Sequence, residues 1–94
     1  MENSSVRAHL FIRGRVQGVG YRAFVQAQAV KRDLTGWVRN LADGGVESEA
    51  EGNRRAVEGF IEALKVGPYL SRVEHVDLQW VESTGQDSFF RIVM

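Results

Sequence analysis

The chain has 94 residues, which is enough for one domain with a single packed core and too few for a second. Its 12 basic and 12 acidic residues cancel, so it lacks the excess charge of a general nucleic-acid or membrane-surface binder. The absence of cysteine excludes disulfides, thiol catalysis and thiolate metal sites.

Residues 1–5 carry no apolar leader, and no later run approaches membrane-spanning length. We therefore expect a cytoplasmic protein with a flexible tail at residues 1–5 and one domain at residues 6–94. The domain opens with a predicted strand, because apolar side chains recur at every second position at Val6, Ala8, Leu10 and Ile12.

A glycine-rich segment follows this strand, from Gly14 to Arg22, and reads GRVQGVGYR. Gly14, Gly18 and Gly20 let the backbone turn sharply and aim successive N–H groups into one concavity. Unpaired N–H groups at the start of the next helix add partial positive charge at the same place. The segment is therefore predicted to bind a phosphate, sulfate or carboxylate.

Arg22 lies in the first turn of the predicted helix, where a cation opposes the helix macrodipole by roughly 0.3 to 1 kcal/mol. Its guanidinium offers a planar fork that matches two phosphate oxygens. The alternative to an anion site is that the glycines only form a tight strand-to-helix turn and that Arg22 points into water. The glycines taken alone favour this alternative. The segment lacks the Lys-Ser/Thr ending of a nucleotide P-loop and a suitably placed acidic ribose partner, so a dinucleotide site is not expected.

The first helix is predicted to run from Tyr21 to Arg32, because Tyr21, Phe24, Val25 and Ala29 share one helical face. After a stop signal at Asp33 to Gly36, a second strand is predicted from Trp37 to Leu41. The turn signature at 43–45 then leads to a third strand, which alternates at Val46, Ser48 and Ala50.

A second helix is predicted between Gly52-Asn53 and Gly67-Pro68, with apolar positions at Val57, Phe60, Ile61 and Leu64. A fourth strand alternates at Val76, Leu78 and Trp80, and a short fifth strand is predicted from Phe89 to Val93. The order βαββαβ plus a C-terminal strand indicates an α+β fold. It is a ferredoxin-like two-layer sandwich, with two helices on one face of a mostly antiparallel sheet.

The other face of this sheet is predicted to be a solvated, charge-paired surface. There Arg7 and Arg13 would lie near Glu47, Glu49 and Glu51. The glutamates resemble a metal cluster, but neighbouring carboxylates and arginines more often form a soluble surface. Single-stranded RNA binding on this face is disfavoured by the glutamates, by the zero net charge and by the presence of one clear aromatic residue, Phe11.

Asn40 is a second candidate for chemistry, near the end of the second strand and on the interior face with Val38. Its amide can accept a hydrogen bond from a water while donating to a neighbour. Its alternative role, which the residues alone favour, is simply to begin the turn. His9 and His75 should lie on the open face, and the chain has no Ser-His-Asp order, no spaced set of metal ligands and no general-base pair.

From Val6 onward the chain resembles the acylphosphatase family, in its small bacterial form. The resemblance rests on GRVQGVGYR at residues 14–22, GWVRN at 36–40, DGGVE at 43–47 and FIEALKVGP at 60–68. The first two segments, at this spacing and in this order of strands and helices, are the specific ones. Leu41 departs from the pattern, because other members carry a hydroxyl residue after the asparagine.

The resemblance implies hydrolysis of the carboxyl-phosphate bond of small acyl phosphates by in-line attack of water, without a metal or cofactor. It implies that Arg22 and Asn40 are catalytic, with Asn40 orienting the water. The phosphate would be held by the loop residues Gln17, Gly18, Val19, Gly20, Tyr21 and Arg22. Inorganic phosphate or sulfate would bind as product or inhibitor, with no nucleic-acid or membrane partner, and a monomer is expected. The alternative is a non-catalytic anion-binding or regulatory module on the same fold.

Overall fold

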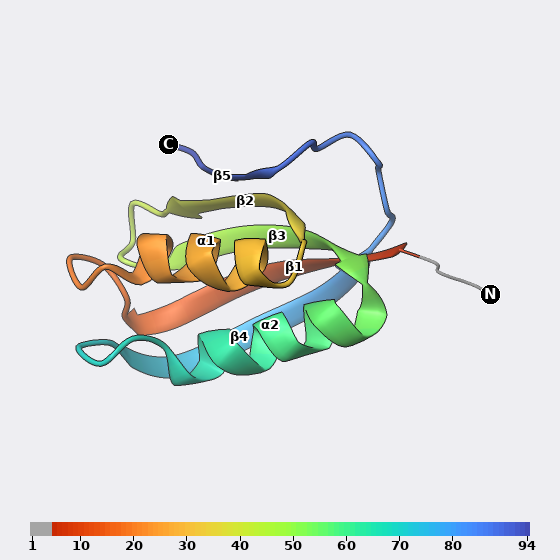
Figure 1. Ribbon diagram of the computed structural model, residues 1–94. Coiled ribbons are helices and arrows are strands. Elements are labelled where there is room, and N and C mark those ends of the chain that lie inside the picture. The colour runs from red at the N-terminus through yellow and green to blue at the C-terminus, as the bar shows by residue number, and fades with distance from the viewer. Residues whose placement is uncertain (1–4) are drawn as a thin grey trace.

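The computed structural model describes residues 5–94, in which five strands and two helices follow the predicted order (Figure 1). They are β1 (Ser5–Arg15), α1 (Tyr21–Lys31), β2 (Thr35–Asn40), β3 (Val46–Asn53), α2 (Arg54–Val66), β4 (Arg72–Val81) and β5 (Phe90–Ile92). The tail expected at residues 1–5 lies outside the described residues apart from Ser5, which begins β1.

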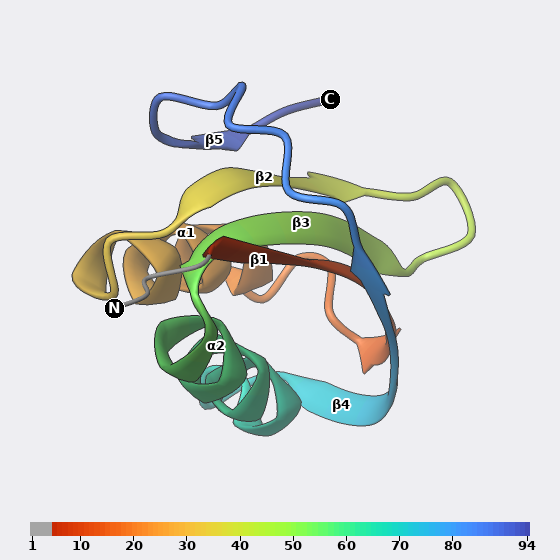
Figure 2. The same cartoon turned by 90° about the vertical axis from the view of Figure 1, so that its right-hand side faces the viewer.

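The strands form one sheet in the order β4-β1-β3-β2-β5. The pairs β1–β3, β1–β4 and β2–β3 are antiparallel, and β2–β5 is parallel. Figures 1 and 2 show α1 and α2 together on one face of this sheet. The predicted ferredoxin-like α+β fold is thereby confirmed.

The core lies between the sheet and the helices, and alternate strand residues supply the sheet's share of it. Its fully buried members include Ala8, Leu10, Ile12, Val25, Ala29, Val38, Val46, Ala50, Val57, Phe60 and Leu64. Burying a large aliphatic or aromatic side chain stabilises the fold by about 1.5–3 kcal/mol, so a one-residue slip of any strand would be costly.

The two helices begin in different ways. Asn53 caps α2, because its side-chain oxygen accepts hydrogen bonds from the backbone N–H groups of Arg55 at 3.0 Å and Ala56 at 3.4 Å. The N-cap residue of α1 is Gly20, so this helix has no side-chain cap. Since a capping side chain contributes about 1 kcal/mol, the start of α1 forgoes a stabilisation that α2 receives.

A β-bulge bends β1 just before the glycine-rich loop. The register between β1 and β4 shifts between Arg13 and Gly14. Gly14 has a φ of +130°, and a Cβ there would overlap the carbonyl oxygen of Arg72 and lie 2.8 Å from the nitrogen of Glu74. The close approach of β4 therefore demands glycine at the point where β1 leads into the loop.

The charged face of the sheet is paired, as expected, but its centre is buried rather than solvated. Arg7 is only 5% exposed, and Glu47 and Glu51 are each 7% exposed. The Nε of Arg7 donates to Glu49 at 2.6 Å, and its Nη1 donates to Glu51 at 2.9 Å. Arg13 does not join them, because it pairs instead with Asp43 at 2.6 Å on the surface.

The connection between β4 and β5 covers Arg7 and Glu51 on this face. In Figure 2 it rises from the end of β4 past the sheet to β5. The carboxylate of Glu51 accepts hydrogen bonds from the backbone N–H groups of Thr84 at 2.9 Å and Gly85 at 3.0 Å. Asp87 places Oδ2 3.0 Å from Nη1 of Arg7. The connection has no hydrophobic period, so no pattern in its residues indicated that it would cover Arg7.

Burial and hydrogen bonding act in opposite directions on the pKa values of Glu49 and Glu51. Burial alone would raise both pKa values, but the hydrogen bonds that the carboxylates accept outweigh it and lower them below the usual 4.5. Arg7 and His9 act on Glu49, while the Thr84 and Gly85 amides and Arg7 act on Glu51. Both carboxylates are therefore held in their charged form.

Replacing Gly14 by alanine should destabilise the fold by about 3 kcal/mol or more, because the methyl group adds overpacking to an unfavourable φ. Urea unfolding would measure the loss. Gly44→Ala is the matched control, since Gly44 has a φ of +97° and a methyl group there would meet no atom within 4 Å. A Gly14→Ala loss no larger than that of Gly44→Ala would contradict the role of the close approach.

Arg7→Met should cost about 3–5 kcal/mol at neutral pH, because it leaves buried carboxylates without their cation. Lys65→Met removes the exposed Lys65–Glu62 pair and should change the free energy of unfolding by less than about 1 kcal/mol.

The wild type should lose stability as the pH falls below about 4.5, because the depressed pKa values of Glu49 and Glu51 stabilise the fold only while these carboxylates are ionised. Urea midpoints between pH 7 and 3 would test this, and a flat wild-type profile would refute it.

Candidate active site

Residues 16–20 form the loop that joins β1 to α1. Gly18 and Gly20 adopt left-handed φ angles of +73° and +76°, and a Cβ at either position would meet no atom within 4 Å. Glycine is therefore required here by the backbone conformation and not by crowding. The first helical hydrogen bond runs from the N–H of Phe24 to the carbonyl of Gly20 at 3.1 Å.

The backbone N–H groups of residues 17–23 donate to no acceptor within residues 5–94. The first turn of α1 also contains no acidic residue that would offset the positive end of the helix dipole. Free amides in a left-handed turn, together with the start of an uncapped helix, form a site that favours an anion.

Buried residues anchor the loop at both ends. Val16 and Tyr21 are each 1% exposed, and the Tyr21 hydroxyl donates to the carbonyl of Leu64 in α2 at 2.8 Å. Burial raises the pKa of the Tyr21 phenol, so this donor stays protonated. With its hydroxyl committed to Leu64, Tyr21 can offer an anion only its backbone N–H.

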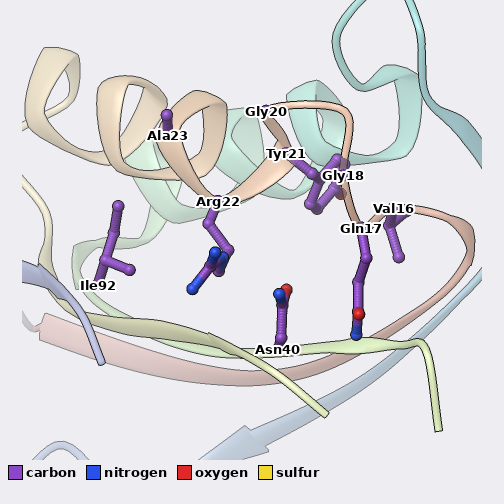
Figure 3. Close-up of a pocket in the computed structure, with 9 residues that line it drawn as sticks. All are labelled: Val16, Gln17, Gly18, Gly20, Tyr21, Arg22, Ala23, Asn40 and Ile92. Atoms are coloured by element: carbon purple, nitrogen blue, oxygen red, sulfur yellow. The ribbon is translucent and has the colours of Figure 1, made fainter. Parts of the chain in front are cut away.

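Arg22 and Asn40 converge from opposite layers of the fold. Figure 3 shows the Arg22 side chain descending from α1 and the Asn40 side chain rising from β2 toward the loop. Arg22 is exposed and forms no ion pair with the described residues. The Oδ1 atom of Asn40 is buried, and residues 5–94 offer it no hydrogen-bond partner.

The groups surround a cavity of about 260 Å³. Its walls are Val16, Gln17, Gly18, Gly20, Tyr21, Arg22, Ala23, Asn40 and Ile92 (Figure 3). The arrangement joins an anion cradle, a free guanidinium and an unpartnered amide oxygen around one space. It can therefore hold a phosphate group and a water at the same time.

Most residues chosen from the sequence meet at this cavity. Val19 is the exception, because its side chain packs partly buried against the core and only its backbone belongs to the loop. The sequence did not single out Val16, Ala23 or Ile92 as lining residues. Ile92 had no detectable signal, since it reaches the site only through the parallel pairing of β5 with β2.

The other candidates lie away from the cavity. His9 faces Glu47 and Glu49 on the opposite face of the sheet, and His75 pairs with Asp77 on the surface. In the part of the chain described, no group of three or more His, Asp or Glu side chains is placed to hold a metal ion. No helix within residues 5–94 is long and apolar enough to cross a membrane.

Comparison with known proteins gives one consistent result. The family model described as Acylphosphatase matches residues 8–92. The chain is 49% identical to the acylphosphatase of Chloroflexus aurantiacus over 88 residues, which cover 94% of this chain and 96% of that protein. It is 53% identical to the acylphosphatase of Thermus thermophilus over 78 residues, covering 83% of this chain and 89% of that protein.

The fold of the chain also matches that of a solved acylphosphatase. The crystal structure of acylphosphatase from Bacillus subtilis superposes with a TM-score of 0.91 at 43% identity, covering 95% of this chain and 99% of that one. The residues matched by the family model, 8–92, include every residue that lines the cavity. By its sequence and by its fold, the chain belongs to the acylphosphatase family.

Proposed function

We propose that the cavity is the active site of this acylphosphatase, with Arg22 and the loop amides of residues 17–22 holding the phosphate and Asn40 orienting the attacking water. The observation that carries the proposal is the buried Oδ1 of Asn40, which has no partner in the described chain. A buried acceptor without a donor costs about 1–3 kcal/mol, and a water donating to it would remove that cost.

The reaction needs a water oxygen in line with the bond between phosphorus and the carboxylate oxygen. A water that donates one hydrogen to Asn40 Oδ1 has a lone pair free to attack phosphorus. The new bond forms between the water oxygen and phosphorus, while the bond to the acyl oxygen breaks and releases the carboxylate. A phosphate oxygen accepts the proton of the water, so no protein base is required.

Charge stabilisation falls to the groups around the phosphate. Negative charge on its equatorial oxygens is matched by the N–H groups of the loop and by the guanidinium of Arg22. These donors are fixed before substrate arrives, because Val16 and Tyr21 anchor the loop in the core. The catalytic contribution is therefore placement and electrostatics, for which neither a metal nor a cofactor is needed.

The substrate is an acyl phosphate, and the cavity recognises mainly its phosphate group. The polar groups that line the cavity all suit the phosphate and the water, which leaves apolar side chains such as Ala23 and Ile92 for the acyl group. We therefore expect several small acyl phosphates to be hydrolysed. Residues 5–94 supply every group that the proposed reaction uses, so we expect a monomer to suffice for activity.

Arg22→Lys should lower turnover by a factor on the order of 10³ or more, because lysine keeps the charge but lacks the two-pronged donor. Its melting temperature should stay close to that of the wild type, since Arg22 is exposed and makes no ion pair with the described residues. Steady-state kinetics beside thermal unfolding would measure both quantities. Full activity in this variant would show that Arg22 does not hold the phosphate.

Asn40→Ala should lower the rate by roughly 10² to 10³, the usual effect of losing one preorganised polar group, while inhibition by inorganic phosphate stays nearly unchanged. The assay is hydrolysis of an aryl acyl phosphate in excess chelator, with wild type and variant prepared identically and checked by circular dichroism. Chelator-resistant turnover that the variant loses would support the proposal. A folded wild type that binds phosphate without turnover would instead indicate a binding module.

A further inference from the structure

The side chain of Gln17 joins the phosphate loop to the hairpin that follows Asn40. Its Nε2 donates to the carbonyl oxygens of Leu41 and Gly45, each at 2.8 Å. Leu41 and Gly45 are the two ends of the β2–β3 turn, where the N–H of Leu41 also donates to the carbonyl of Gly45 at 2.8 Å. In Figure 3 the Gln17 side chain extends from the loop down to the strand that carries Asn40.

Val16 and Tyr21 anchor the two ends of the loop in the core and Val19 packs partly against it, but few polar contacts join the loop to the hairpin beside Asn40. The amides of residues 17–23 donate to no acceptor in the described chain, and the Cβ positions of Gly18 and Gly20 face open space. The Arg13–Asp43 ion pair also holds the hairpin, but both side chains are largely exposed and Arg13 precedes the loop. Gln17 is thus the side chain that ties the anion cradle itself to the segment bearing Asn40.

We propose that Gln17 is a positioning residue, whose side-chain amide sets the separation between the phosphate cradle and the water held by Asn40. The inference rests on the proposed function, in which the loop binds phosphate and Asn40 binds the water. Both hydrogens of one amide group are used on two carbonyls of the same turn, so the hairpin can neither slide along the loop nor swing away from it. Although Gln17 lines the cavity, both hydrogens of its side-chain amide are used by the hairpin, so we assign it an effect on turnover that acts through the position of Asn40.

Its loss should impair turnover and leave phosphate binding nearly intact. Misplacing reacting groups by about 1 Å costs on the order of 10²-fold in rate. Gln17→Met preserves the length of the side chain without a donor. We expect kcat to fall by about 10-fold to 10²-fold, and inhibition by inorganic phosphate to change by less than about threefold, because Arg22 and the loop amides remain.

A double-mutant cycle shows whether Gln17 acts through Asn40. In the Asn40→Ala background there is no water-orienting amide left to misplace, so adding Gln17→Met should lower kcat by less than about threefold further. If instead the two losses multiply in the double variant, Gln17 acts independently of Asn40 and the inference is overturned.

Gln26→Met is the matched control. Gln26 also donates through Nε2 to a backbone carbonyl, that of Phe90 at 3.1 Å, and that bond is also partly buried. It ties α1 to β5 instead of joining the loop to the hairpin. Its loss should therefore lower the urea midpoint to a degree similar to that of Gln17→Met, with kcat within about threefold of the wild type.

The inference fails if folded Gln17→Met keeps kcat within about threefold of the wild type, or if Gln26→Met loses as much turnover as Gln17→Met. Should Gln17→Met not fold, Gln17→Asn is measured by the same criteria, since its shorter amide cannot span both carbonyls. The two proposals fail separately. Full activity in Asn40→Ala refutes the proposed function, whereas inactive Asn40→Ala beside fully active Gln17→Met refutes only the role of Gln17.

Discussion

Pairing of β1 along both of its edges is the constraint on which the other parts of the molecule depend. Its antiparallel partners β3 and β4 place the inward residues Ala8, Leu10 and Ile12 at the centre of the core. The same pairing holds Arg7 against the carboxylates of β3 on the opposite face. At its end, the bulge at Gly14 turns the strand into the loop that forms one wall of the cavity.

Positive charge is neutralised by nearby carboxylates at one place in the protein and, within residues 5–94, left without a partner at another. Arg7 is buried and forms ion pairs with three carboxylates, those of Glu49, Glu51 and Asp87. Because Asp87 lies in the connection to β5, its ion pair holds this connection against the sheet. The positive end of α1 and Arg22 have no compensating group in the described chain and remain open to an incoming anion. The first arrangement stabilises the fold, while the second leaves positive charge available for the phosphate that we propose binds there.

The sequence was informative where structure follows from local periodicity or turn chemistry. Alternation at Ala8, Leu10 and Ile12 predicted the core strand correctly, and the glycines at 18 and 20 predicted the sharp turn that follows it. That this loop binds an anion stays a prediction. The burial of Arg7 escaped prediction, because it depends on an aperiodic connection whose backbone amides reach Glu51. The role of Ile92 could not be predicted either, because the parallel pairing of β5 with β2 requires no particular residue type. The partners of Gln17 could not be predicted because they are backbone carbonyl oxygens, which every residue has.

The pairing of β1 with β4 also orders events during synthesis. During synthesis β1 leaves the ribosome before either of its neighbours in the sheet, residues 46–53 and then 72–81, has been made. Ile92, near the end of the chain, completes the wall of the cavity. A nascent chain that already contains Arg22 and Asn40 therefore lacks the sheet that holds them in place. The cavity is therefore complete only after β5 has emerged, and long-range pairing of this kind slows the final step.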